Sequence, residues 1–257
     1  METYNFLGFD IPIDLLNMTG GGVSDFDDIA FGHFEYLKKY VDMRPTDSIL
    51  EIGCGIGRDA IPLTQFVTTG TYDGIDIIGR SIEWCKENIQ SKFTNFQFHH
   101  FDVEDQLHNP TGKDRLDKYS IPCKDSSVDK IFLWSVFTHM FELDISYYLK
   151  EFHRVLKPEG KILITCFIVN DEILRQARMV DLTPWSLRFE HKHADGCFIN
   201  NIDYPTGAVA YEEQKLQEII EGSGLVKVGQ TLTGQWWGNN SGLGFGQDVM
   251  VLKINHD

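Results

Sequence analysis

The sequence predicts an α/β fold built on a doubly wound, largely parallel sheet. Short apolar segments typical of strands alternate with amphipathic helical segments over residues 48–169, a pattern that indicates parallel strands joined by helices. A glycine-rich turn directly follows the first of these strands. The link over residues 233–246 is rich in glycine and has no helical period, whereas a parallel return needs a crossover helix. We therefore expect the last two strands to pair antiparallel.

The predicted elements follow one another in a regular order. Residues 1–23 have no clear period and end in three glycines, so we expect them to lie over the domain without forming a core element. A helix is expected through Val41, with Ser24 and Asp27 as a reduced capping box at its start. The next predicted elements are a strand at 48–52, a helix from about Asp59, a strand at 71–77, a helix from Ser81, and strands at 96–102 and 128–135.

The remaining segments complete one predicted domain over residues 1–257, whose cofactor-binding core spans 40–169. Residues 104–127 have no period, which indicates a functional rim loop. Residues 170–210 contain hairpin-like segments, and we expect them to form a lid inserted before the C-terminal part, 211–257. The other predicted elements are a helix at 144–157, a strand at 161–169, a helix at 211–221, and strands at about 225–232 and 248–254.

The composition argues against several classes of partner. The 257 residues include 38 Asp and Glu but 23 Lys and Arg, a formal net charge of -15, which repels nucleic acids and anionic membranes. The apolar runs fall short of the roughly 20 residues that span a bilayer, and the acidic start is unlike a signal peptide. We expect a cytoplasmic protein. The five scattered cysteines contain no C-x-x-C, so neither a disulfide framework nor a metal site is predicted.

The glycine turn carries the first candidate residues. Gly53, Gly55 and Gly57 follow a strand, where they would let a ligand approach the backbone at a helix N-terminus. The dinucleotide fingerprint G-x-G-x-x-G requires glycine where this chain has Arg58, so binding of a pyrophosphate is disfavoured. Asp76 ends the second strand 23 residues after Gly53, where a carboxylate accepts hydrogen bonds from ribose hydroxyls.

Two further carboxylates lie near the same predicted sheet edge. Glu51 precedes the glycines, and Asp102 ends the third strand. A site with three acids suits a cationic nucleoside better than an anionic one.

At these residues the chain resembles the class I S-adenosylmethionine-dependent methyltransferases. The segments that carry the resemblance are 49–57, 72–76, 101–103, 127–135 and 154–161. The resemblance implies a Rossmann-like sheet of seven strands in the order 3-2-1-4-5-7-6, with S-adenosyl-L-methionine as cofactor and S-adenosyl-L-homocysteine as product. Residues 135–140 and 246–253 are similar to a bacterial subgroup that methylates small molecules.

The resemblance also implies roles for individual residues, all of them in cofactor binding. The implied contacts are Glu51 near the amino group, Gly53, Gly55 and Gly57 along the methionine and ribose, Asp76 at the ribose hydroxyls, Ile77 and Val103 beside the adenine, Asp102 at the adenine amino group, and Ser135 and Val136 beside the methionine.

Candidates for the acceptor side have two interpretations each. His139 follows the fourth strand and is either a general base for a hydroxyl or ammonium acceptor or a locally packed residue. Trp236 and Trp237 either wall an acceptor pocket or pack the final loop onto the sheet edge. His191, which alternates with His193, either contacts the acceptor or belongs to a solvated hairpin face.

We therefore expect a methyltransferase that acts by in-line displacement on an oxygen or nitrogen of a small-molecule acceptor. One alternative is an NAD-dependent oxidoreductase, which the glycine spacing and the antiparallel hairpin disfavour. Another is a non-catalytic S-adenosylmethionine-binding protein. We expect no nucleic-acid or membrane partner. The sequence leaves the acceptor and the oligomeric state open.

Overall fold

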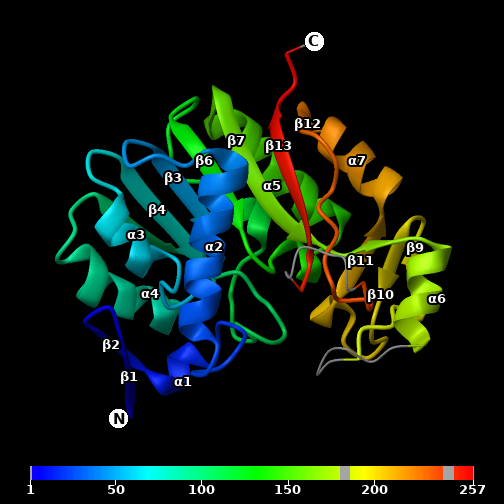
Figure 1. Ribbon diagram of the computed structural model, residues 1–257, viewed down its shortest axis with the longest axis horizontal. Helices are drawn as coiled ribbons and strands as arrows, with labels where there is room; N and C mark the ends of the chain where they lie inside the picture. Colours follow the sequence, from blue (N-terminus) through cyan, green and yellow to red (C-terminus); the bar gives the residue numbers. More distant parts are fainter. Residues whose placement is uncertain (1, 180–185, 240–245, 257) are drawn as a thin grey trace. The chain divides into compact units, whose positions relative to one another are not determined.

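The computed structural model describes residues 2–179, 186–239 and 246–256 (Figure 1). Residues 180–185 of the predicted lid and 240–245 of the predicted final loop lie outside the described residues. Backbone contacts group the chain into two compact units, residues 1–132 and 133–257, which are described in turn.

The central sheet has the predicted strand order. Its seven strands run β12-β13-β7-β6-β3-β4-β5, which in chain order and read from the opposite edge is 3-2-1-4-5-7-6. β4 pairs in parallel with both β3 and β5. β13 pairs antiparallel with both β7 and β12. The prediction of a doubly wound sheet with an antiparallel last strand is confirmed.

The first unit contains a hairpin, four α-helices and the parallel part of the sheet. Its elements are β1 (Thr3–Phe6), β2 (Phe9–Pro12), α1 (Ile13–Leu16), α2 (Phe26–Val41), β3 (Ser48–Ile52), α3 (Ala60–Phe66), β4 (Thr71–Asp76), α4 (Gly79–Cys85), the π-turn η1 (Lys86–Gln90), β5 (Phe96–His100), the 3₁₀ turn η2 (Leu116–Lys118) and β6 (Val128–Leu133). β3 is buried from Ile49 onward, as expected for a strand covered on both faces. α3 begins just after Asp59, as predicted.

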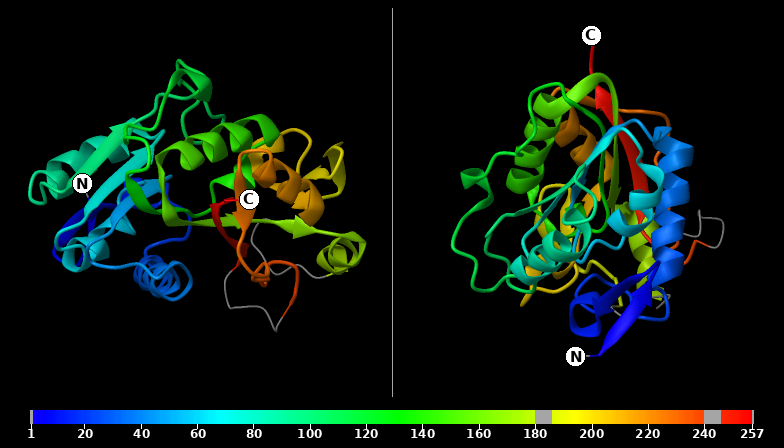
Figure 2. Two further views of the ribbon diagram at one scale, coloured as in Figure 1. Left: turned by 90° about the horizontal axis from the view of Figure 1, so that it is seen from above. Right: turned by 90° about the vertical axis from the view of Figure 1, so that its left-hand side faces the viewer.

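The N-terminal segment differs from its prediction. Residues 3–12 form an antiparallel hairpin, and Ile11 is fully buried. Phe6 packs edge-on against Phe26 at a ring distance of 5.4 Å, so the hairpin lies against the start of α2 (Figure 2). The expectation that residues 1–23 contribute no core element is therefore wrong. The capping box is also wrong, because α2 starts after Asp25 and Asp27 instead accepts a hydrogen bond from Tyr4.

The second unit contains the antiparallel edge of the sheet and a smaller sheet. Its elements are the 3₁₀ turn η3 (Phe137–His139), α5 (Glu142–Val155), β7 (Leu156–Cys166), β8 (Ile168–Val169), α6 (Asp171–Met179), β9 (His191–Ala194), β10 (Cys197–Ile199), the 3₁₀ turn η4 (Pro205–Gly207), β11 (Val209–Glu212), α7 (Glu213–Glu221), β12 (Leu225–Lys227) and β13 (Asp248–Ile254). The helix predicted at 211–221 starts two residues later, because Tyr211 and Glu212 belong to β11.

In the described part of the predicted lid, β9 and β10 belong to a sheet of four strands that also includes β8 and β11 at the borders of the lid. Its order is β8-β11-β10-β9, in which β11 pairs in parallel with β8 and antiparallel with β10 (Figure 1). A hydrophobic cluster fills one side of this region; its buried members are Phe167, Val169, Leu174, Ala177, Phe189, Ala208, Ala210 and Trp236. The segment thus has more regular structure than the hairpins that the sequence predicted.

Candidate active site

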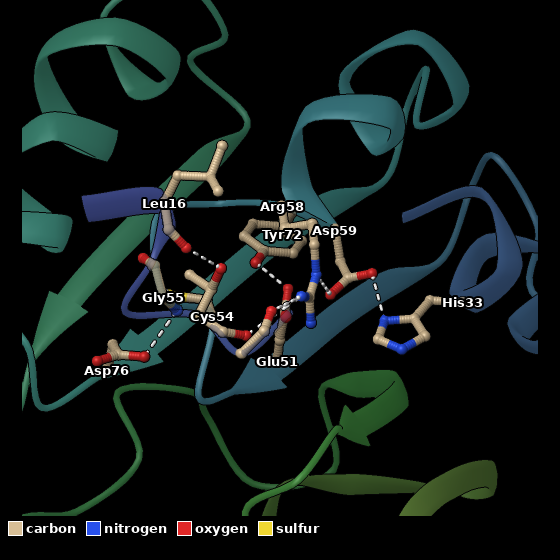
Figure 3. Close-up of polar contacts among 11 residues, drawn as sticks. Leu16, His33, Glu51, Cys54, Gly55, Arg58, Asp59, Tyr72 and Asp76 are labelled. Atoms are coloured by element: carbon tan, nitrogen blue, oxygen red, sulfur yellow. Dashed lines mark hydrogen bonds and ion pairs between the residues drawn. The ribbon is translucent and has the colours of Figure 1, made fainter. Parts of the chain in front are cut away.

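Asp76 lies at the carboxyl end of β4 and is bonded to the glycine turn. Its Oδ2 accepts a hydrogen bond from the Gly55 N–H at 2.7 Å (Figure 3). Its Oδ1 accepts one from the Ile78 N–H at 2.7 Å. Burial raises the pKa of Asp76, and these two hydrogen bonds act in the opposite direction. An ionised carboxylate has about four acceptor positions, so both oxygens keep capacity for further donors such as hydroxyl groups.

The glycine turn needs its glycines for conformation and for space. Gly53, Gly55 and Gly57 all have positive φ, at 77°, 52° and 80°. A Cβ on Gly55 would lie 2.7 Å from the Thr19 methyl group, and one on Gly57 would lie 2.8 Å from the Ile89 side chain. The turn is therefore a close-packed backbone cradle with an acceptor carboxylate beside it.

Glu51 points into a buried polar network behind this turn. Its side chain is 1% exposed and accepts a hydrogen bond from the Tyr72 hydroxyl. Burial raises the pKa of Glu51 well above its ordinary value, and the nearby charge of Asp59 raises it further. The folded protein therefore favours the neutral form of this carboxyl group more than an exposed glutamate would. Its predicted contact with an amino group stays a prediction.

A second buried pair lies next to Glu51. His33 Nδ1 is 2.8 Å from Asp59 Oδ1, and both side chains are almost fully buried (Figure 3). Burial lowers the pKa of His33, and the carboxylate of Asp59 acts in the opposite direction. Burial acts to raise the pKa of Asp59, but the charge and hydrogen bond of His33 and the charge of Arg58 outweigh it, so the pKa of Asp59 is lowered.

Sequence reasoning missed this pair, although a signal was present. His33 occupies the buried stripe of α2 together with Ala30 and Leu37, where an apolar residue is usual. A polar residue in such a stripe requires a buried partner, and only the fold identifies that partner as Asp59.

We expect Glu51→Gln to make stability less dependent on pH. The folded pKa of Glu51 lies above its ordinary value of 4.5, so the folded state retains a proton that the unfolded chain releases. The stabilising contribution is complete below pH 4.5 and is lost as the pH rises through the folded pKa. Gln accepts the Tyr72 hydrogen bond without ionising. Urea unfolding at several pH values should show a shallower decline for the variant, and equal slopes would contradict a raised pKa of Glu51.

Asp102 lies half-buried just beyond β5. Its Oδ1 accepts a hydrogen bond from Asn109 at 3.1 Å, and Lys113 Nζ lies 3.8 Å from its Oδ2. The carbonyl of Val103 also accepts a hydrogen bond from Asn109, at 3.0 Å. Ile77 is half-buried and directly follows Asp76. The structure thus places these three predicted residues after the ends of β4 and β5, on the side of the sheet edge that carries Asp76.

An open pocket of about 420 Å³ lies beside the same strand ends. The residues that line it come from α1's C-terminal end, α4 and the loop after β5: Met18, Ile78, Gly79, Arg80, Glu83, His100, His108, Asn109, Pro110 and Thr111. A hydrogen bond to Asp105 raises the pKa of His108. Asn109, which lines this pocket, also donates a hydrogen bond to Asp102.

In the second unit, Ser135 and Val136 lie just after β6. Ser135 has a left-handed backbone with φ 59°, and its N–H donates to the Thr165 hydroxyl at 2.7 Å. Gln247 donates a hydrogen bond to the Ser135 hydroxyl. Left-handed backbone at a residue other than glycine is uncommon, and such strain concentrates at functional sites.

His139 has a defined tautomer. Its Nδ1 lies 2.9 Å from the backbone oxygen of Thr206, and a carbonyl can only accept. The Nδ1 therefore carries the proton, and in the neutral imidazole Nε2 carries the lone pair that a general base needs. The geometry is compatible with the predicted role and does not test it.

The two tryptophans and His191 occupy different environments. Trp236 is 3% exposed, packs against Phe167 and Phe189, and donates from Nε1 to Asp248 at 2.9 Å. Trp237 is partly buried against the same cluster. His191 is half-buried at the start of β9. For Trp236 these contacts favour packing, and the acceptor roles of all three residues stay predictions.

Within residues 2–179, 186–239 and 246–256, no group of three or more His, Cys, Asp and Glu side chains is placed to hold a metal ion. In the same part of the chain, no helix has the length and apolar character needed to cross a membrane.

Comparisons with known proteins agree with the geometry. Residues 44–222 match the family model described as a methyltransferase domain. The methyltransferase GfsG of Streptomyces halstedii is 26% identical over 135 residues, which cover 52% of this chain and 43% of that protein. A 2-phytyl-1,4-naphtoquinone methyltransferase of Nostoc is 29% identical over 136 residues, covering 52% of each. The chain therefore matches about half the length of these curated relatives.

Solved structures share the fold. A SAM-dependent methyltransferase from Aquifex aeolicus aligns with a TM-score of 0.54 and 16% identity, covering 94% of this chain and 97% of that one. One from Methanosarcina mazei aligns with a TM-score of 0.52 and 20% identity, covering 84% and 95%. At these identities the likeness concerns the fold.

Proposed function

The chain belongs to the methyltransferase domain family as a class I S-adenosylmethionine-dependent member, and from this premise we propose that it methylates a small-molecule acceptor at oxygen or nitrogen. The observation that carries the proposal is the position of Asp76. Its carboxylate lies at the end of β4 and accepts a hydrogen bond from the Gly55 N–H of the glycine turn. The name of the Nostoc relative, a naphtoquinone methyltransferase, supports a small-molecule acceptor.

The residues present fit the cofactor. The glycine turn at the end of β3 exposes no side chains of its own, and Asp76 beside it offers acceptor positions for two hydroxyl groups. Asp102 offers a carboxylate to an amino group at the next strand end. When bound, S-adenosylmethionine supplies a methyl group activated on a sulfonium, for direct in-line displacement.

The chain's own contribution is orientation, exclusion of water and one base. Asp76, Asp102 and the glycine turn would hold the cofactor in a fixed orientation, which lowers the entropic part of the barrier. His139 would take a proton from the acceptor at Nε2, because the bond to Thr206 keeps its Nδ1 protonated. No covalent bond to the enzyme is needed.

Calorimetry with three ligands and an acceptor panel tests the proposal. S-adenosylmethionine and S-adenosylhomocysteine should bind, whereas NAD should not. Binding of NAD alone would favour the oxidoreductase. Binding of S-adenosylmethionine without turnover on hydroxyl, amine and quinone acceptors would favour a non-catalytic binding protein.

We expect Asp76→Ala to weaken S-adenosylhomocysteine binding by more than about tenfold, because hydrogen bonds to an ionised acceptor contribute about 1.5–3 kcal/mol each. Asp73→Ala is the matched control, since Asp73 lies on the same strand and pairs with His99 at 2.8 Å. Calorimetry on variants with native circular dichroism measures both. Unchanged affinity in Asp76→Ala would remove this residue from the binding site.

A further inference from the structure

A short glycine-rich strap lies on the glycine turn. It comprises residues 17–22, between α1 and α2. The Thr19 methyl group fills the position where a side chain on Gly55 would be, at 2.7 Å from the ideal Cβ. Gly55 is also the residue whose N–H binds Asp76. The strap and the candidate ribose carboxylate therefore meet at one residue of the turn.

Hydrogen bonds hold both ends of the strap, and at its C-terminal end the Gly22 carbonyl accepts one from the Asp25 N–H at 3.1 Å. On one side Leu15 and Leu16 are buried, and the Thr19 hydroxyl and N–H both donate to the Leu16 carbonyl, at 2.7 and 3.1 Å. Beyond Thr19, Gly20 and Gly21 have φ of 70° and 74°, a conformation that residues with a side chain rarely adopt. The strap has a natural hinge at these glycines.

Arg58 fastens this bend to the turn. Its Nη1 donates to the carbonyl oxygens of Thr19 at 3.2 Å and of Gly20 at 3.0 Å (Figure 3). The side chain is 12% exposed, and its Nε lies 4.0 Å from Asp59 Oδ2. The guanidinium thus lies within ion-pair distance of the buried Asp59 and bonds to two carbonyl oxygens of the strap. Arg58 is the residue that disfavoured dinucleotide binding, and the sequence left open whether it neutralises the acidic sheet edge or points to solvent.

We propose that Arg58 is a positioning residue that latches residues 17–22 onto the glycine turn, and that release of this latch admits and frees the cofactor. The gating part rests on the proposed function, because it requires the glycine turn to bind S-adenosylmethionine. The latch itself is a property of the free protein. The two parts are therefore measured separately.

Hydrogen exchange of the free protein tests the latch. In Arg58→Ala, the amides of residues 17–22 should exchange about tenfold faster, because two hydrogen bonds from a charged donor are lost, while amides of β3 and β4 keep their rates. Arg58→Lys, with one ammonium in place of the guanidinium fork, should fall between the two. Arg44→Ala is the control, since Arg44 makes an exposed pair with Asp42. Unchanged strap exchange in Arg58→Ala overturns the latch.

Stopped-flow dissociation of S-adenosylhomocysteine tests the gate. Arg58→Ala should release it about tenfold faster than the parent protein and Arg44→Ala. Faster strap exchange with unchanged dissociation overturns the gate and leaves the latch standing. If S-adenosylhomocysteine does not bind to the parent protein, both the proposed function and the gate are overturned. The hydrogen-exchange measurement on the free protein still tests the latch.

Thr19→Ser carries the test if Arg58→Ala does not fold. Serine keeps the hydroxyl bond to Leu16 and removes the methyl group from Gly55. We expect dissociation to be a few-fold faster with native circular dichroism. Dissociation at the parental rate would contradict the gate.

Discussion

His139→Ala should lower kcat by about 10²–10⁴-fold while cofactor affinity stays nearly unchanged. The reason is the tautomer: the Thr206 carbonyl holds the proton on Nδ1, so Nε2 is the basic nitrogen. In the parent enzyme kcat should fall on acidification, because a protonated imidazole cannot accept a proton. This acid limb should be absent from the variant. Steady-state kinetics over pH with a turned-over acceptor, together with calorimetry, measure both effects.

His139→Asn separates catalysis from structure. An asparagine amide can donate to the Thr206 carbonyl much as Nδ1 does, but it is not a base at neutral pH. We expect the Asn variant to be folded and as slow as the Ala variant. If Asn restores kcat, or if Ala retains more than about half of it, His139 is structural and proximity alone accounts for the rate.

Asp248→Ala should lower the free energy of unfolding by about 3–5 kcal/mol. Asp248 is 2% exposed and accepts three hydrogen bonds: from the N–H of Ile168 at 2.8 Å, the N–H of Gly234 at 2.8 Å and Nε1 of Trp236 at 2.9 Å. Alanine leaves three donors without this acceptor. Urea unfolding measures the loss, which should accompany a change in tryptophan fluorescence.

Two variants make the Asp248 result specific. Asp248→Asn keeps one acceptor oxygen and places an amide donor against the remaining N–H, so we expect a smaller loss of about 1–3 kcal/mol. Glu190→Ala removes an exposed carboxylate from the same unit and should change stability by less than about 0.5 kcal/mol. Equal unfolding free energies for Asp248→Ala and Glu190→Ala would show that the three hydrogen bonds contribute little.

The sheet could be predicted because the patterns that specify it involve residues close together in the sequence. The apolar run of β3, the glycines after it and Asp76 at the end of β4 are local patterns, and parallel strands with right-handed crossovers leave few arrangements open. The antiparallel pairing of β12 with β13 followed from one local fact, the lack of a helical period before β13. Fold class, the antiparallel last hairpin and the position of the turn needed only short-range information, whereas the strand order came from the resemblance to the methyltransferase family.

The N-terminal segment and the lid show where this information ends. Residues 3–12 lack a long period, yet Phe9 is buried, because it packs against Trp84 and Phe93, which are distant in the chain. The four-stranded sheet likewise pairs β8 with β11, about 40 residues apart in the chain. Such pairings depend on loop closure and on shared burial, which short sequence windows do not contain.

The sequence by itself determined the sheet, the glycine turn and the carboxylate at its edge, because strand period and turn chemistry are local properties of the chain. Only the tertiary structure decided which polar groups are buried together. Glu51 with Tyr72, His33 with Asp59, and Arg58 with the strap are partners more than 20 residues apart. Burying a polar group without a hydrogen-bond partner costs free energy, so each of these groups is buried beside a partner. Only the complete fold brings such distant partners together.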